Sequence, residues 1–214
     1  GTGFRFPGLS ERYFSGSAGR GQVIANENLD PERSLTTDIG ARFFGSRVFA
    51  AAYLYRTAID DYIERIDLEP GVRTFVNLTS GTITGFEFES FYQATDALQL
   101  QLTGQLTEGE ADDGSPLAES PADRFTLGGT YARGAWSGSL RWQHRFAKDD
   151  PGPGEVATEN AQIVSASLQY IMSDGLALVL FADNLLDETY LPTADDLAVP
   201  AAGRSIGLGI RWGG

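Results

Sequence analysis

Segments that alternate between apolar and polar residues recur along the whole chain, and they constrain its fold more than any other feature. In 98–107 the leucines occupy one face and the glutamines and threonines the other, which is the period of two of a β-strand with unlike sides. Other segments of this kind are 34–44, 82–92, 124–131, 136–146 and 204–212, with less cleanly separated runs at 48–63, 161–170 and 176–184. The sequence therefore predicts an all-β fold.

The connections between these segments are alternately short and long, without exception. The short ones lie near 45–46, 94–96, 133–134 and 173–174, and the long ones are 11–33, 65–77, 108–123, 147–160 and 187–203. A soluble sandwich would show the same side-chain alternation. Turns at one end and loops at the other are instead typical of an antiparallel up-and-down transmembrane β-barrel. We therefore predict a barrel.

The length of the strands and the charged residues on their polar faces agree with a membrane-spanning barrel. Trp136 and Phe146 bracket one apolar face, which at a rise of about 3.3 Å per residue extends roughly 33 Å. Tilted by about 40°, such a strand covers roughly 25 Å of the membrane normal, the height of a barrel's apolar band. Charged residues on the opposite faces are Arg42, Glu87, Glu89, Arg124, Arg141 and Arg145. A wet or plugged lumen tolerates such charges, whereas a packed core would require a partner for each.

The composition excludes several classes of protein. The chain of 214 residues has no cysteine and a net charge of −13, which excludes disulfides and argues against nucleic-acid binding. It contains no phosphate-binding glycine loop, serine-hydrolase motif or zinc-protease motif. The single histidine, His144, shares a face with Trp142, so we interpret it as an interfacial side chain. We predict that the chain is not an enzyme and needs no cofactor.

The segment 184–190, with the sequence NLLDETY, resembles a known family signature. It is similar to the Asn-Leu-x-Asp-x-x-Tyr motif of TonB-dependent outer-membrane receptors, and the matching residues are Asn184, Leu185, Asp187 and Tyr190. Segments 3–13, 26–34, 59–63, 84–87 and 203–205 resemble other elements of that family in the same order. We expect the strand to leave the hydrocarbon near Ala182, the polar residues to face water or headgroups, and Tyr190 to anchor in the interfacial belt.

The resemblance implies a 22-stranded barrel around a globular plug. Residues 1–214 are then expected to be the C-terminal part of the barrel, with about ten strands, and the plug is expected upstream. It further implies an outer-membrane location, a monomeric barrel in contact with lipid and lipopolysaccharide, and TonB as a partner through the plug. The implied ligand is a small metal chelate such as a ferric siderophore or a cobalamin. A small self-contained barrel, acting as a passive pore or adhesin, is the alternative.

Ligand binding is expected at the rim and in the long loops. The candidate residues are Arg5, Phe6, Tyr13, Arg73, Arg145 and Lys148. The basic members suit an anionic chelate, and the aromatic members suit the wall of the mouth. Asp112 and Asp113 belong to an acidic loop that is a weak candidate for calcium. The spacing of this loop does not match an EF-hand, which favours an ordinary solvated loop.

Overall fold

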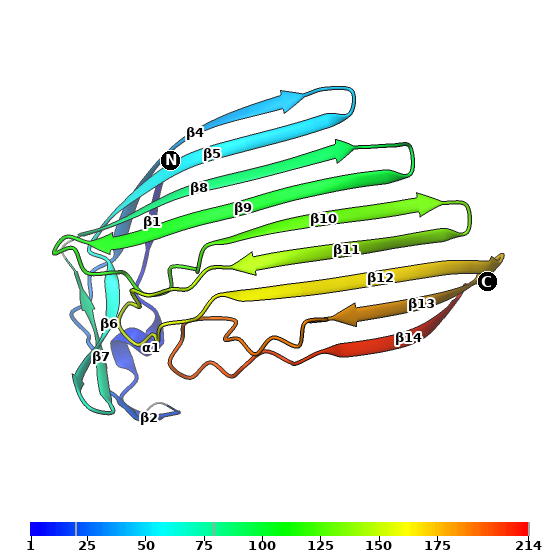
Figure 1. Cartoon of the computed structure of the whole chain (residues 1–214). Helices are drawn as coiled ribbons and strands as arrows, with labels where there is room; N and C mark the ends of the chain where they lie inside the picture. Colours follow the sequence, from blue (N-terminus) through cyan, green and yellow to red (C-terminus); the bar gives the residue numbers. More distant parts are fainter. Residues whose placement is uncertain (20, 79, 214) are drawn as a thin grey trace.

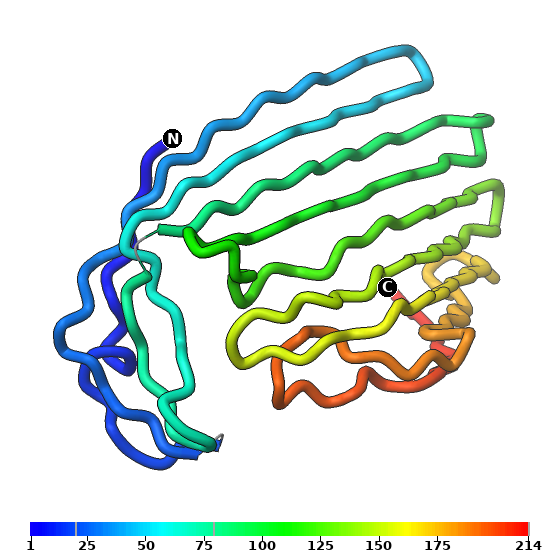
Figure 2. The backbone as a smooth tube through the Cα atoms, turned by 60° about the vertical axis from the view of Figure 1, so that its left-hand side comes forward, coloured from blue at the N-terminus to red at the C-terminus, as the bar shows by residue number. Residues whose placement is uncertain are grey.

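A single antiparallel sheet dominates the computed structural model, which describes residues 1–19, 21–78 and 80–213. Its ten strands are ordered β1-β4-β5-β8-β9-β10-β11-β12-β13-β14, and they curve into a trough (Figures 1 and 2). Their bounds are β1 Thr2–Arg5, β4 Glu32–Phe44, β5 Val48–Asp60, β8 Ser80–Gln93, β9 Leu98–Ala111, β10 Arg124–Arg133, β11 Trp136–Arg145, β12 Ala161–Ser173, β13 Leu176–Asp183 and β14 Ser205–Trp212. The prediction of a partial barrel with about ten strands is confirmed. Within this chain the sheet does not close, and β1 and β14 are its edges.

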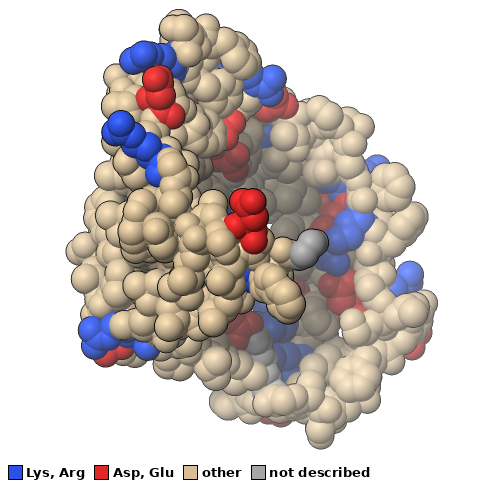
Figure 3. All heavy atoms as spheres, turned by 90° about the vertical axis from the view of Figure 1, so that its right-hand side faces the viewer, with Lys and Arg blue, Asp and Glu red and all other residues tan. Residues whose placement is uncertain are grey.

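The two faces of the sheet differ in polarity. The outer face carries large apolar side chains that are mostly exposed, such as Ile39 (72% exposed) and Leu208 (74% exposed). The concave face carries Tyr53, Glu87 and Arg124, which line one hollow together. Figure 3, seen from the end with the short turns, shows charged side chains inside the trough. This distribution is the reverse of that in a soluble domain, and it suits lipid outside and a polar lumen inside.

Aromatic side chains gather near both ends of the outer face. Towards the long loops, Phe125 lies 5.0 Å from Trp142 and 5.9 Å from Phe146 between ring centroids, and His144 lies 4.6 Å from Phe146. Towards the short turns, Trp136 and Tyr170 lie 4.5 Å apart. Such pairs of belts mark the two interfaces of a membrane barrel. His144 occupies the interfacial position expected from its neighbours in sequence.

A second, smaller sheet lies at the long-loop end (Figure 1). It contains β2 (Gly16–Ala18), β3 (Gly21–Val23), β7 (Val72–Asn77) and β6 (Ile63–Glu69), in that order, and the short helix α1 (Leu9–Tyr13) lies nearby. The long connection predicted at 65–77 lies between β5 and β8, and most of it forms the β6–β7 hairpin, which the sequence did not predict. The predicted strand 48–63 ends at Asp60, since Asp61 adopts a left-handed φ of 56° that turns the chain. No helix in the described ranges is long and apolar enough to cross a membrane.

Candidate ligand-binding site

A cavity of about 690 Å³ opens among the long loops, where β1, β4, β6, β10 and β11 reach the rim. Its wall also includes residues from the loops that follow β9, β11 and β13. Charged residues lining it include Arg5, Glu32, Glu64, Arg65, Arg124 and Arg145. A cavity of this size suits a small ligand.

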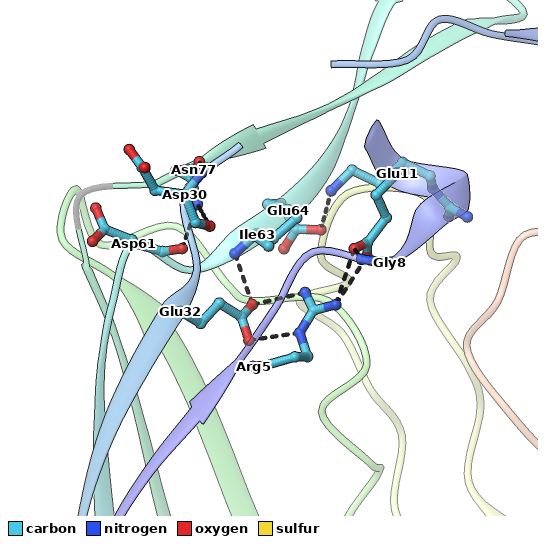
Figure 4. A network of polar contacts seen from close by, with 10 residues as sticks. Arg5, Gly8, Glu11, Asp30, Glu32, Asp61, Ile63, Glu64 and Asn77 are labelled. Atoms are coloured by element: carbon cyan, nitrogen blue, oxygen red, sulfur yellow. Dashed lines mark hydrogen bonds and ion pairs between the residues drawn. The ribbon is translucent and has the colours of Figure 1, made fainter. Parts of the chain in front are cut away.

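Arg5 is held in an ion-pair network at the wall of this cavity (Figure 4). Its Nε and Nη2 donate to the two carboxylate oxygens of Glu32 at 2.7 and 2.9 Å, and its Nη1 donates to Glu11 at 3.0 Å. Glu32 also accepts a hydrogen bond of 2.8 Å from the backbone N–H of Ile63. The charge of Arg5 is therefore matched by carboxylates of the same chain. Its position indicates that it ties β1, β4, β6 and α1 together.

Asn77 forms a second link in the same region (Figure 4). Its Nδ2 donates to the carbonyl oxygens of Asp30 (3.0 Å) and Asp61 (2.6 Å), and its Oδ1 accepts from the Asp30 N–H at 2.9 Å. This amide holds the segment before β4 against the turn between β5 and β6. Sequence reasoning missed both Asn77 and Glu32 because their partners lie tens of residues away in the chain.

Arg73 and Lys148, two further predicted ligand residues, are also ion-paired. Arg73 donates to Asp67 at 2.9 Å and to Asp196 at 2.6 Å. Lys148 pairs with Glu155 and donates to the carbonyl oxygen of Ser120 at 2.9 Å. Both cations connect long loops to one another.

The predicted aromatic residues of the mouth lie away from the cavity wall. Phe6 is exposed and packs edge-to-face on Phe4, with 5.4 Å between ring centroids. Tyr13 is exposed in α1, where the guanidinium of Arg12 lies 5.5 Å from its ring. Arg145 does line the cavity, and it donates to the carbonyl oxygen of Pro192 at 2.8 Å. Of the six predicted residues, the cavity wall includes only Arg5 and Arg145 within the described part of the chain.

The acidic loop after β9 does not form a cation site. Asp112 accepts a hydrogen bond from the Ser80 hydroxyl, and Asp113 accepts from the backbone N–H (2.9 Å) and hydroxyl (2.6 Å) of Ser115. Among the residues that the structure describes, no group of three or more His, Asp or Glu is placed to hold a metal ion.

The NLLDETY segment forms a compact turn between β13 and β14. Asn184 is 4% exposed; its Nδ2 donates to the carbonyl oxygens of Glu188 (2.8 Å) and Ala202 (3.1 Å), and its Oδ1 accepts from the Glu188 N–H at 3.0 Å. Asp187 accepts a hydrogen bond of 2.8 Å from the Arg204 N–H. The expectation that Asn184 faces water was therefore wrong, since the loop's own backbone surrounds its amide.

The neighbouring motif residues join this turn to the rest of the sheet. The backbone N–H of Leu185 donates to the carbonyl oxygen of Val164 on β12 at 2.8 Å. Tyr190 places its ring 5.8 Å from the guanidinium of Arg145. Arg145 projects to the concave side, so Tyr190 meets the cavity wall instead of the lipid belt that the sequence suggested.

Glu64 is a buried acid that sequence reasoning did not single out. It is 5% exposed, and its carboxylate accepts hydrogen bonds from the backbone N–H groups of Arg65 (2.8 Å) and Ala118 (3.4 Å). Burial raises the pKa of Glu64 above its ordinary value of 4.5, because the charged form loses hydration. This side chain joins β6 to the loop between β9 and β10.

We expect Glu64 to make the stability of the full-length protein depend on pH. Because its pKa is raised, the folded state binds the proton more tightly than the unfolded state, so stability falls as pH rises above 4.5. Glu64→Gln removes this contribution, so the melting temperature of the wild type, recorded from about pH 4 to 8, should fall relative to that of the variant as pH rises. Glu69→Gln, on an exposed part of the same strand, is the control. Parallel profiles for wild type and Glu64→Gln would contradict the expectation.

Comparison with known proteins agrees with this architecture. Residues 1–185 match the family model described as TonB dependent receptor-like, beta-barrel. The vitamin B12 transporter BtuB of Vibrio vulnificus (strain YJ016) is 25% identical over 192 residues, which are 89% of this chain and 30% of that protein. The chain thus spans about a third of the length of the curated relatives that it matches.

Solved structures share the fold. The copper transporter OprC superposes with a TM-score of 0.86 at 21% identity, over 99% of this chain and 35% of that one. The ferric-catecholate import receptor Fiu from K12 E. coli superposes with a TM-score of 0.70 at 22% identity, over 94% of this chain and 30% of that one. With the outer apolar face, the polar concave face and the alternating turns and loops, these matches show that the chain belongs to the TonB-dependent receptor family, within its β-barrel domain.

Proposed function

We propose that this chain is part of an outer-membrane receptor that binds a small metal chelate at its long-loop end and imports it. The observation that carries the proposal is the cavity at the rim of a sheet whose outer face is apolar and whose inner face is charged. The family supports transport as the activity. Relatives named for vitamin B12, copper and ferric catecholate support a metal-containing ligand.

The remaining partners follow from the same proposal. A globular plug, contributed by another part of the protein, occupies the concave side, and TonB acts through that plug to supply energy. Lipid and lipopolysaccharide contact the outer face between the two aromatic belts. The receptor acts as a monomeric barrel.

A passive pore or adhesin is the competing function. The sheet edges favour the receptor, because an unpaired strand edge is unfavourable in lipid. We propose that further strands, from other parts of the protein, pair with the edges β1 and β14 in a larger barrel.

Uptake and conductance measurements on the full-length protein test this function. Cells that express it are expected to accumulate radiolabelled cobalamin, a ferric siderophore or copper, and matched cells that lack TonB should lose this accumulation. In planar bilayers the purified protein should give no steady current, because the plug fills the lumen. Steady conductance together with TonB-independent uptake would instead establish a passive pore.

A further inference from the structure

We infer that Arg124 and Arg145 together form a binding site for an oxyanion group, a carboxylate or phosphate, on the ligand that enters the cavity. This inference rests on the proposed function and adds a chemical class to it. The two residues are directly opposite each other in the β10–β11 ladder. Opposed side chains in an antiparallel pair have Cβ atoms about 5 Å apart, and like charges so placed are destabilising. An anion held between them removes this repulsion.

No carboxylate of the described residues neutralises either guanidinium. Arg124 donates to the neutral amide oxygen of Gln105 at 3.1 Å. Arg145 donates to the carbonyl oxygen of Pro192 at 2.8 Å and lies 5.8 Å from the Tyr190 ring. Neither takes part in an ion pair with another described residue. By contrast, Arg5, Arg73 and Lys148 each have carboxylate partners.

The acids near this pair have other partners or lie farther away. Asp123, the residue before Arg124, accepts a hydrogen bond of 2.8 Å from the Thr107 N–H. Glu87 is on the same face, but the strand register places Gln105 between it and Arg124. In the cavity wall, Glu11, Glu32 and Glu155 pair with Arg5 or Lys148. Glu64 and Asp195 accept hydrogen bonds from backbone N–H groups, and Glu119 makes no ion pair with either arginine. The positive charge of Arg124 and Arg145 is therefore available to a ligand.

The orientation of the pair points to a ligand inside the barrel. Phe125 and His144, the neighbouring residues in sequence, belong to the aromatic belt of the outer face, so Arg124 and Arg145 project to the concave side. Both line the 690 Å³ cavity. A lipopolysaccharide phosphate in the outer leaflet lies on the opposite side of the sheet. The planar guanidinium fork suits two parallel hydrogen bonds to one oxyanion.

The loop between β13 and β14 has a positioning role in this site. It supplies the two groups that contact Arg145, namely the Tyr190 ring and the Pro192 carbonyl oxygen. The same loop is shaped by the buried amide of Asn184. The NLLDETY segment therefore acts on the site through Arg145, without lining the cavity itself.

Calorimetric titration of the full-length receptor with small anions tests the inference. Malonate and inorganic phosphate serve as probes, and malonamide, which has the same shape without charge, is the ligand control. At low ionic strength we expect malonate binding that malonamide does not reproduce. Arg124→Gln and Arg145→Gln should each weaken anion binding by roughly tenfold or more, since each removes a charge-assisted pair of hydrogen bonds. Arg141→Gln, on the same strand and face but opposite Gly128, should leave the affinity unchanged.

A charge reversal gives an independent readout. Arg124→Glu places a carboxylate opposite Arg145, so it should abolish anion binding and raise the melting temperature. A lower melting temperature for this variant, with no anion binding by the wild type, would show that the pair faces a carboxylate of the plug and would overturn the inference. Equal affinity of wild type and both glutamine variants would overturn it as well. If uptake in cells persists in either case, only the oxyanion site fails, and the proposed transport stands.

Discussion

Replacing Asn184 with alanine is expected to lower the free energy of unfolding of the full-length receptor by about 3 kcal/mol, because buried backbone groups lose their partners. Three hydrogen bonds disappear together, those to the Glu188 and Ala202 carbonyl oxygens and that from the Glu188 N–H. The residue also has a φ of 49°, which an asparagine tolerates better than an alanine does. Denaturant unfolding in detergent, followed by tryptophan fluorescence, measures the difference.

Two further substitutions separate these contributions. Asn184→Gly keeps the left-handed backbone without strain but loses every side-chain bond. Asn184→Asp keeps the acceptor for the Glu188 N–H but loses both donated bonds. If hydrogen bonding dominates, Asn184→Gly should be nearly as destabilising as Asn184→Ala. Asn184→Asp should also be less stable than the wild type, because it loses both donated bonds and buries a charge. Wild-type stability in the glycine variant would contradict this account.

Replacing Leu117 with alanine is expected to release the loop between β9 and β10 from the rim, at a cost of about 3 kcal/mol. Leu117 is 1% exposed, and its side chain fits against Gly81 and Gly109, where a Cβ atom would lie 2.9 and 3.2 Å from it. Its backbone N–H donates to the Gly109 carbonyl oxygen at 2.9 Å. The truncation leaves a cavity beside Gly81 and Gly109. Faster amide hydrogen exchange in 112–123 should report the release.

Two controls define that result. Leu68→Ala removes the same atoms from a leucine that is 55% exposed, so exchange in 112–123 should not change. Gly81→Val fills the space from the opposite wall and should free the loop as Leu117→Ala does. If the amides of 112–123 exchange as slowly in both Leu117→Ala and Gly81→Val as in the wild type, other contacts hold this loop.

The barrel strands could be predicted from the sequence because their signal is local. A strand at a lipid–lumen boundary alternates residue by residue, so 98–107 and 136–146 reveal their own faces. The β6–β7 hairpin escaped the same reasoning, since it borders neither lipid nor lumen, and its residues do not separate cleanly into two faces. The site was predicted only in part for a similar reason. Arg5, Arg73 and Lys148 looked like free cations because the sequence does not show how the chain folds back on itself, although each has one carboxylate partner six or seven residues away.

The sequence by itself determined the class of fold, the family, the concave position of the six charged strand residues named above and the end that carries the long loops. Only the tertiary structure decided which charges cancel, because ion pairs such as Arg73–Asp196 join residues that are 123 positions apart. It also decided that Arg124 stands opposite Arg145. The alternation of residues assigns each residue to one face of the sheet. Which residue of the neighbouring strand lies opposite it depends on the strand register, and register depends on the pairing of whole strands.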